Sequence, residues 1–209
     1  MAVAVMAYAT STGTRRNIEA MRKHGISLLI TPTNTKAWPG MRYAIDNGAF
    51  GAWQSGREWA ARPWLDLLRQ YGERADWSVL PDIVHGGLES LALSLRYLQQ
   101  VRDMSRLHLI AVQDGMAADD IRSHVGARVG IFVGGSTEWK ERSLPVWGRL
   151  ASETGCYLHV GRVNTNRRIK LCAMAGADSF DGTSATRFAV TVPRIAAAAA
   201  QGAFLWDAR

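Results

Sequence analysis

The sequence is poor in cysteine and has no long apolar run. Its two cysteines, Cys156 and Cys172, form no C-x-x-C pair and have no cluster of histidines beside them. We therefore expect neither a disulfide framework nor a four-ligand zinc site, and we expect a reducing, cytoplasmic environment. No apolar run reaches the roughly 18 residues that a membrane span needs, so we expect no membrane partner.

Acidic residues are scarce relative to basic ones. The chain has 18 Asp and Glu residues against 25 Lys and Arg residues, which gives a net charge of +7. Such an excess favours a polyanionic partner such as nucleic acid, because Arg and Lys neutralise phosphates and release counterions. A basic surface without a partner is the alternative interpretation.

The length and composition fit one folded unit. The chain has 209 residues, of which 47% are hydrophobic, and this is enough for one domain with a core and little for two. No linker-like segment divides it, so we expect a single domain over residues 1–209. The apolar segment Met1–Thr10 lacks a basic leader and indicates a first strand rather than a signal peptide.

Short apolar runs alternate with amphipathic stretches along the whole chain. The runs are rich in Val, Ile, Leu and Tyr and mostly end in Gly, Asp, Thr or Pro, which is typical of buried parallel strands. We expect strands at Ala4–Ala9, Ser27–Thr31, Arg42–Asp46, Trp77–Asp82, Leu107–Gln113, Val129–Gly134, Cys156–Gly161 and Ala177–Asp181.

The stretches between these runs have helical spacing, except for Pro32–Gly40, which we expect to be a loop. We expect helices at Thr14–His24, Ser55–Tyr71, Leu88–Met104, Ala117–His124, Trp139–Ser152, Thr165–Ala175 and Thr186–Gln201. Eight strands alternating with helices predict the α/β class and a compact, closed (β/α)₈ TIM-like barrel. An open doubly wound sheet is the second choice.

Chemically useful residues follow six of the predicted strands. In (β/α)₈ barrels the active site lies at the carboxyl ends of the strands. The strand ends carry Asp46–Phe50, Pro81-Asp82, Gln113–Gly115, Gly134–Ser136, His159–Arg162 and Asp178–Gly182. Two of these carboxylates could divide the nucleophile and acid/base roles at a glycosidic carbon. Another carboxylate, a glutamine and backbone amides could read a purine edge, and an aromatic ring could stack on the base.

Each of these residues also has a purely structural interpretation. Asp82 and Asp114 could cap helices, and Gly134-Gly135 could serve a tight turn. His159 is more often a structural histidine than a catalyst. Most of the eight tryptophans should be packing residues, with Trp38 and Trp53 in predicted loops as the exceptions.

A cluster of basic residues lies near the last predicted strands. Arg162, Arg167 and Arg168 could be a solvated helix face. Together with Lys170 and Arg187 they could instead form a track for nucleic-acid phosphates.

Four of the strand-end segments, in their order along the chain, resemble motifs of the tRNA-guanine transglycosylase superfamily. Asp46-Asn47-Gly48-Ala49-Phe50 is similar to D-S-G-G-[FY], and Ala111–Gly115 is similar to V-Q-G-G. Phe132–Gly135 resembles A-V-G-G. Gly176–Asp181 followed by Thr186-Arg187 resembles G-[VI]-D-M-F-D followed by P-T-R.

The resemblance implies a base-exchanging pentosyltransferase that needs no metal or other cofactor. Asp181 would be the nucleophile that attacks C1′, and Asp46 would be the general acid/base. The implied base pocket comprises Asp82, Gln113, Gly134, Gly135, Ser136, the stacking aromatic Phe50, and Val160 with Gly161 at the floor. The implied contacts to the nucleic-acid backbone are Arg162, Arg167, Arg168 and Arg187.

The departures from the family pattern shift the expected substrate. The C-x-C-x-x-C…H zinc site of the tRNA enzymes has no counterpart here, the second glycine of D-S-G-G is Ala49, and the proline of P-T-R is Ala185. These features resemble the phage and bacterial relatives that insert 7-deazaguanines into DNA. We therefore expect DNA and a free base such as 7-cyano-7-deazaguanine as partners, in the host cytoplasm if a phage encodes the protein.

Several alternatives stay open at this point. The substrate could be tRNA instead of DNA. The protein could be an N-glycoside hydrolase or another barrel enzyme that shares only the fold. It could also be a non-catalytic nucleic-acid-binding subunit. The sequence does not decide the accepted 7-substituent, the target sequence or the oligomeric state.

Overall fold

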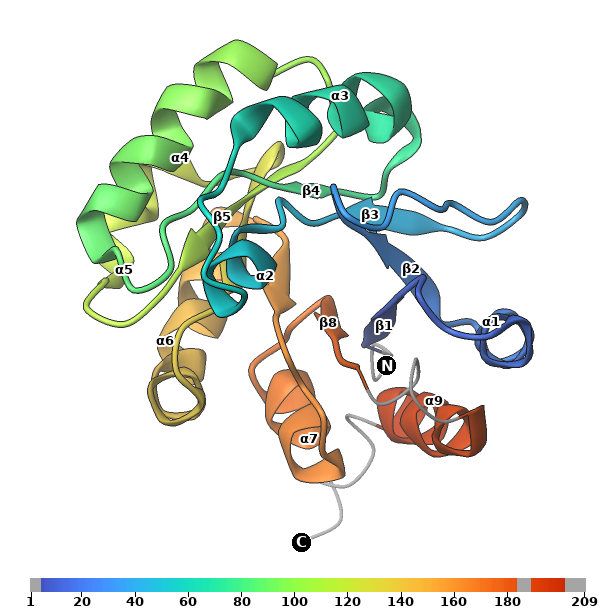
Figure 1. The fold of residues 1–209 in the computed structure, drawn as a ribbon. Helices are drawn as coiled ribbons and strands as arrows, with labels where there is room; N and C mark the ends of the chain where they lie inside the picture. Colours follow the sequence, from blue (N-terminus) through green and yellow to red (C-terminus); the bar gives the residue numbers. More distant parts are fainter. Residues whose placement is uncertain (1–4, 184–188, 202–209) are drawn as a thin grey trace, which may run out of the picture.

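The fold is a closed barrel of eight parallel strands (Figure 1). The computed structural model describes residues 5–183 and 189–201. The strands are β1 Met6–Thr10, β2 Ser27–Ile30, β3 Tyr43–Ile45, β4 Ser78–Val79, β5 His108–Val112, β6 Val129–Val133, β7 Leu158–Val160 and β8 Ser179–Asp181. Each expected strand is present, and β8 pairs with β1 in the register Met6↔Ser179 and Tyr8↔Asp181. This pairing confirms the barrel and excludes the open sheet.

Helices surround the barrel on the outside (Figure 1). They are α1 Arg15–Lys23, α2 Ala49–Gln54, α3 Ala61–Tyr71, α4 Gly87–Val101, α5 Ala118–Ile121, α6 Thr137–Thr154, α7 Asn166–Met174 and α9 Val192–Gln201, with short 3₁₀ turns at Gly72–Arg74, Arg122–His124 and Ala189–Thr191. No helix connects β2 to β3, as the Pro32–Gly40 segment predicted. Within the described residues, no helix is both long enough and apolar enough to cross a membrane.

The prediction of one helix over Ser55–Tyr71 was wrong. Within this span the structure has only α3, which begins at Ala61; residues 55–60 are not helical, and the short helix α2 precedes them. The reason is Pro63, which lies in the first turn of α3. Proline is tolerated there, but inside a continuous helix it would clash with the carbonyl group of residue 59 and remove a hydrogen bond. The preceding helix α2 contains Trp53, which we had expected in a loop.

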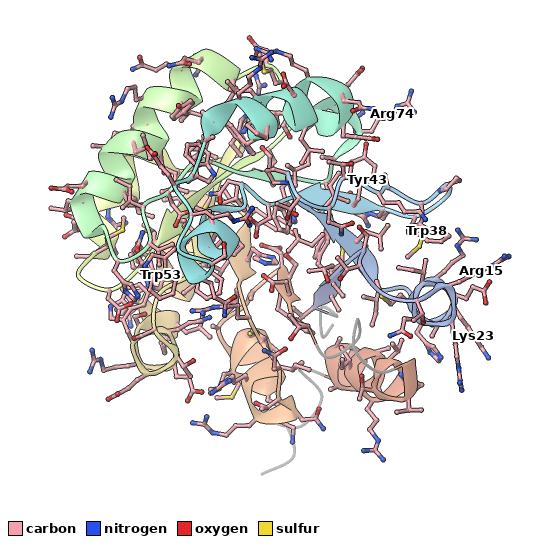
Figure 2. The ribbon with its side chains drawn as sticks, viewed as in Figure 1. Arg15, Lys23, Trp38, Tyr43, Trp53 and Arg74 are labelled. Atoms are coloured by element: carbon pink, nitrogen blue, oxygen red, sulfur yellow. The ribbon has the colours of Figure 1, made fainter. Side chains whose placement is uncertain are left out.

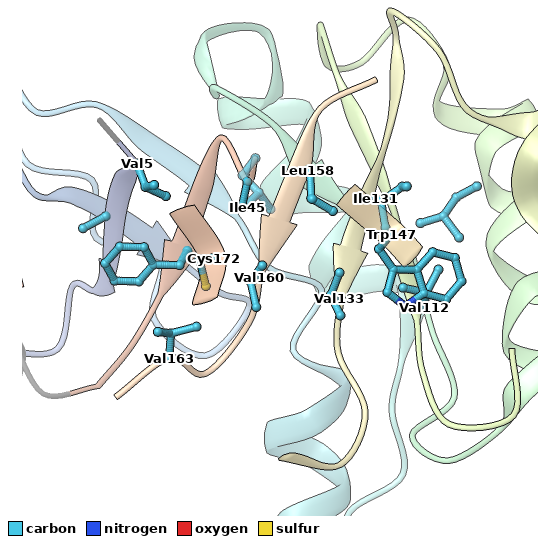
Figure 3. Packing of buried hydrophobic residues seen from close by; sticks show 14 of the residues in the cluster. Val5, Ile45, Val112, Ile131, Val133, Trp147, Leu158, Val160, Val163 and Cys172 are labelled. Atoms are coloured by element: carbon cyan, nitrogen blue, oxygen red, sulfur yellow. The ribbon is translucent and has the colours of Figure 1, made fainter. Parts of the chain in front are cut away.

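The strands bury both of their faces, and successive side chains alternate between them. Tyr8, Leu29, Ala44, Trp77, Val79, Leu109 and Ala111 form one buried cluster, which fills the barrel interior. The outward-facing residues pack under the helices in a second, larger cluster, part of which Figure 3 shows around Val112, Val133 and Val160. The alternation continues to the strand ends and just past them, so that Asp46, Gln113 and Asp181 themselves occupy inward-facing positions. The barrel thus directs three polar side chains to its mouth.

Trp77 is the largest side chain in the barrel interior, so a substitution of this residue tests the packing. Its ring is fully buried and lies 5.0 Å from that of Tyr8 and 4.4 Å from that of His159, between centroids. Trp77→Ala should lower the free energy of unfolding by about 3–5 kcal/mol, because it leaves a cavity that the barrel cannot close. Denaturant unfolding followed by circular dichroism measures this loss.

Trp53→Ala is the matched control for this measurement, because Trp53 is 52% exposed. It should change stability by less than about 1 kcal/mol. Equal losses in the two variants would contradict the interior position of Trp77.

Candidate active site

A pocket of about 310 Å³ opens at the carboxyl ends of the strands. This volume suits a single heterocyclic base or a ligand of similar size. The lining residues are Asp46, Asn47, Phe50, Trp53, Val79, Asp82, Val84, His85, Ala111, Val112, Gln113, Phe132, Gly134, Gly135, Ser136, Thr137, Arg162 and Asp181. The structure therefore brings nine of the expected site residues into one pocket: Asp46, Phe50, Asp82, Gln113, Gly134, Gly135, Ser136, Arg162 and Asp181.

Asp181, the last residue of β8, is held by one N–H donor on each carboxylate oxygen. His159 Nε2 lies 3.1 Å from Oδ2, and the backbone amide of Arg162 donates to Oδ1 at 3.0 Å. The side chain is only 13% exposed. Two donors in fixed positions hold the carboxylate in one orientation.

Gly161 lets this arrangement form because it has no side chain. A Cβ atom at this position would lie 2.7 Å from Cζ of Phe132 and 3.4 Å from Oδ2 of Asp181. Any residue with a side chain would therefore require the Phe132 ring to shift. Gly161 thus allows the Phe132 ring to approach closely, although it does not line the pocket itself.

Val160 does not form the pocket floor, contrary to the expectation. Its side chain is buried on the outer face of β7, beside Cys172 and Val163 (Figure 3). The reason is the alternation of strand side chains. His159 points into the barrel, so its neighbour Val160 must point out toward the helices.

Asp46 has a different environment from Asp181. Its Oδ1 accepts a hydrogen bond from the amide of Gly48 at 2.6 Å. Desolvation raises the pKa of Asp46 to about 7, and the nearby charges of Asp181 and Asp82 act in the same direction. A carboxyl group with such a pKa can exchange a proton with a ligand near neutral pH.

Asp82 is oriented by Asn47, a residue that the sequence interpretation did not single out. Asn47 Nδ2 donates to Asp82 Oδ1 at 2.7 Å and to the carbonyl oxygen of Leu80 at 2.6 Å. Burial raises the pKa of Asp82. Asp82 is not a helix cap, because α4 begins after Gly86. Asn47 could have been found from the sequence, because it lies inside the segment that resembles D-S-G-G.

Gln113 presents its carbonyl oxygen to the pocket. Its amide nitrogen donates to the carbonyl oxygen of Ile83 and to Ser90 Oγ, both at 2.9 Å. A backbone carbonyl can only accept a hydrogen bond, which assigns the nitrogen to that side. Gln113 and Asp82 both line the pocket, so Oε1 of Gln113 and the second oxygen of Asp82 are candidate hydrogen-bond acceptors for a ligand.

The backbone at Ser136 is already engaged. Asp114 accepts hydrogen bonds from the amide of Ser136 at 2.7 Å and from its hydroxyl at 2.6 Å. A Cβ atom on Gly135 would lie 2.5 Å from the same carboxylate, so the close approach of Asp114 requires glycine there. The amide of Gly134 donates to the carbonyl oxygen of Val112 at 2.8 Å, so among Gly134, Gly135 and Ser136 the amide of Gly135 remains the candidate for reading a base.

Aromatic and cationic side chains form the rim of the pocket. The Arg162 guanidinium carbon lies 4.4 Å from the centroid of the Phe50 ring, and its Nη2 donates to the carbonyl oxygen of Gly135 at 2.6 Å. One face of Phe50 is therefore covered. Trp53 packs beside Phe50 and beside His85, a rim residue that no sequence pattern indicated.

The two tryptophans that we expected in loops lie on different sides of the molecule (Figure 2). Trp53 lines the pocket. Trp38 lies beyond β2 and packs its ring under the ammonium group of Lys36, 4.1 Å from the ring centroid. Only Trp53 can contact a ligand in the pocket.

The expected phosphate track is only partly assembled. Arg162 lines the pocket, whereas Arg167 and Arg168 on α7 both pair with Glu141, at 2.6 and 2.8 Å. Arg187 lies outside the described residues. A phosphate would have to compete with Glu141 for two of these side chains.

No protein-family model matches the sequence, and no curated protein matches it. In the described part of the chain, no three His, Cys, Asp or Glu side chains are grouped as a metal site would require. The fold and the geometry of the pocket therefore carry the functional interpretation.

The pKa of Asp46 predicts a stability that depends on pH. A carboxyl group whose pKa rises on folding, here from 3.8 to about 7, binds more protons in the folded state between these values. The free energy of unfolding must then fall as pH rises through this window. Asp46→Asn removes the titration but can still accept the hydrogen bond from Gly48. It should be more stable than the unaltered protein at pH 8, by up to about 4 kcal/mol, and equal to it near pH 4.

Urea unfolding at pH 4 and pH 8 measures this difference. Asp119→Asn on α5 is the control, because Asp119 is exposed at the surface. If Asp46→Asn gained no stability at pH 8, the carboxyl group of Asp46 would not be desolvated.

Proposed function

We propose that this protein is a pentosyltransferase that replaces guanine in DNA with a 7-deazaguanine base through a covalent intermediate on Asp181. One observation carries the proposal: a single base-sized pocket holds two carboxyl groups in opposed environments. Asp181 receives N–H donors on both oxygens, whereas Asp46 is desolvated and titrates near neutrality. Such a pair suits a nucleophile and a proton carrier, respectively.

The first displacement releases guanine. An Asp181 oxygen attacks C1′ of the target nucleoside, and the bond between C1′ and N9 breaks with its electron pair moving to the purine. Asp46, protonated, donates its proton to the departing base. The products are free guanine, a glycosyl ester on Asp181 and an ionised Asp46.

The second displacement installs the new base. The ionised Asp46 accepts the N9 proton of the 7-deazaguanine as N9 attacks C1′. The ester bond to Asp181 breaks and restores its carboxylate, while Asp46 is protonated again. Two inversions retain the anomeric configuration. Proton and charge balance over the cycle without an external cofactor.

The hydrogen-bonding groups of the pocket favour guanine-type bases. Oε1 of Gln113 and the second oxygen of Asp82 are acceptors on one side of the pocket. The N1–H and 2-amino groups of guanine are donors on adjacent positions of one edge. Adenine offers no such pair, and buried acceptors left without a donor would cost binding energy.

DNA is the polymer that we propose. The net charge of +7 favours nucleic acid in general, and Arg162 places one cation at the rim. Ala49 and Ala185, at which the motifs depart from those of the tRNA enzymes, favour DNA over tRNA. The target base would have to leave the helical stack, at a cost of roughly a few kcal/mol.

The product of the reaction tests this proposal. The protein is incubated with duplex DNA that carries labelled guanine, and separately with tRNA, each with 7-cyano-7-deazaguanine. Nucleosides are then analysed by mass spectrometry. We expect the deazaguanine nucleoside in DNA, with an equal release of label. Product in tRNA alone would identify tRNA rather than DNA as the substrate. Base release without replacement would indicate an N-glycoside hydrolase. With neither change, the proposed activity would be wrong.

Asp181→Asn should abolish the exchange and leave DNA binding nearly unchanged, since an amide oxygen cannot form the glycosyl ester. Asp178→Asn is the matched control: this residue lies just before the same strand, and its carboxylate accepts a hydrogen bond from the amide of Leu158 at 2.8 Å. The control should keep its activity. Exchange by Asp181→Asn at the rate of the control would exclude Asp181 as the nucleophile.

The acid role of Asp46 predicts a pH profile. Without an incoming base, formation of the covalent intermediate should slow as pH rises above about 7, because the proton donor is lost. Asp46→Asn should be roughly 10²- to 10⁴-fold slower and lack this inflection. Rapid quenching and denaturing gels measure the adduct. A variant that keeps the inflection would assign the titration to another group.

A further inference from the structure

A row of hydrogen-bonded side chains runs through the barrel interior to Asp181. The Tyr157 hydroxyl donates to Ser179 Oγ at 2.8 Å, and Ser179 Oγ lies 2.7 Å from Nδ1 of His159. Nε2 of His159 lies 3.1 Å from Oδ2 of Asp181. His159 and Ser179 are fully buried, so these bonds are sheltered from competition with water.

The donors in this row all point toward Asp181. An ionised carboxylate can only accept, so His159 must carry its proton on Nε2. Burial lowers the pKa of His159, which favours the neutral ring. Nδ1 is then an acceptor for the Ser179 hydroxyl, and Ser179 in turn accepts from Tyr157. No other assignment satisfies all three contacts with a neutral histidine.

Packing prevents the His159 ring from turning away. The Phe132 ring stacks on it with centroids 4.9 Å apart, and the Trp77 ring lies 4.4 Å away on a tilted plane. Tyr8 approaches edge-on at 6.0 Å. The direction of the Nε2–H bond is therefore set by the barrel core.

Other charged groups also face this end of the row. Lys140 on α6 is buried, donates to the carbonyl oxygen of Gly161, and interacts electrostatically with both His159 and Asp181. Asp46 interacts with Asp181 across the pocket. Of these groups, His159 is the one whose side chain contacts the carboxylate directly.

We propose that His159 is a positioning residue, which with Ser179 and Tyr157 holds the Asp181 carboxylate in one orientation, aimed into the pocket. This inference rests on the proposed function, in which Asp181 is the nucleophile. A buried histidine need not have such a role, and the chain contains a counterexample. Nδ1 of His108 contacts Ser78 in the same way, but its Nε2 contacts the backbone carbonyl oxygen of Val101 instead of a carboxylate.

The two serine–histidine pairs provide a matched experiment. Ser179→Ala and Ser78→Ala each remove one hydroxyl from Nδ1 of a buried histidine, so both should lower stability. Only Ser179→Ala should lower the kcat of base exchange. His159→Leu should lower kcat roughly 10- to 100-fold, the loss expected for one hydrogen bond to a charged group, with KM for DNA little changed. His159→Gln, whose amide can replace the Nε2–H donor, should recover part of the loss.

Unaltered kcat in folded His159→Leu, or equal kcat losses in Ser179→Ala and Ser78→Ala, would overturn the positioning role. A leucine variant that fails to fold does not prevent the test, because the serine variants and His159→Gln give the same comparison.

Nitrogen-15 NMR of the free protein supplies a readout that needs no activity. We expect His159 as the neutral Nε2–H tautomer, with an Nε2–H proton signal that shifts in Asp181→Asn. An Nδ1–H tautomer would overturn the inference even if exchange occurs. The expected tautomer together with no base exchange by the unaltered protein would support the hydrogen-bonded row and contradict the proposed function.

Discussion

The closure of the barrel by β1 and β8 is the constraint on which the pocket depends. Asp46 follows β3 and Asp181 ends β8, so an open sheet in chain order would separate them by five strand spacings, roughly 24 Å. The pairing of Tyr8 with Asp181 instead brings the last strand back to the first and both carboxylates to one mouth. A one-residue slip in this register would turn Asp181 toward the helices. The fold therefore determines both the proximity and the direction of the two groups.

Differences in burial and hydrogen bonding then give the aspartates of the pocket different chemical environments. Three aspartates line the pocket, and each has its own set of donors. Asp181 has two N–H groups, Asp82 is bound by an asparagine amide, and Asp46 has one backbone amide and little solvent. Burial raises the pKa of Asp46 and Asp82, and these different surroundings are the basis of the separate chemical roles that we propose. The separate roles of nucleophile and proton carrier can therefore be filled by aspartates alone.

Much of this could be predicted from sequence, and the failures have physical reasons. Strand positions and the residues that follow them are local properties, so Asp46, Gln113 and Asp181 could be placed correctly. The orientation of Val160 depends on which face of β7 turns inward, and the coverage of Phe50 depends on Arg162, whose φ is +57°. Asn47 and His85 act through contacts with distant segments. Pro63 was a local signal for the later start of α3 that the helical spacing obscured.

The polar row inside the barrel connects the packing of the core with the geometry of the site. Burying Tyr157, Ser179 and His159 would be costly if any of their polar atoms lacked a partner. Each has one, and the last partner in the row is the carboxylate itself. The aromatic rings that stabilise the barrel also fix the His159 ring, so a change in core packing must change the position of Asp181. Preorganisation of the pocket is thus a consequence of interior packing rather than of the loops at the rim.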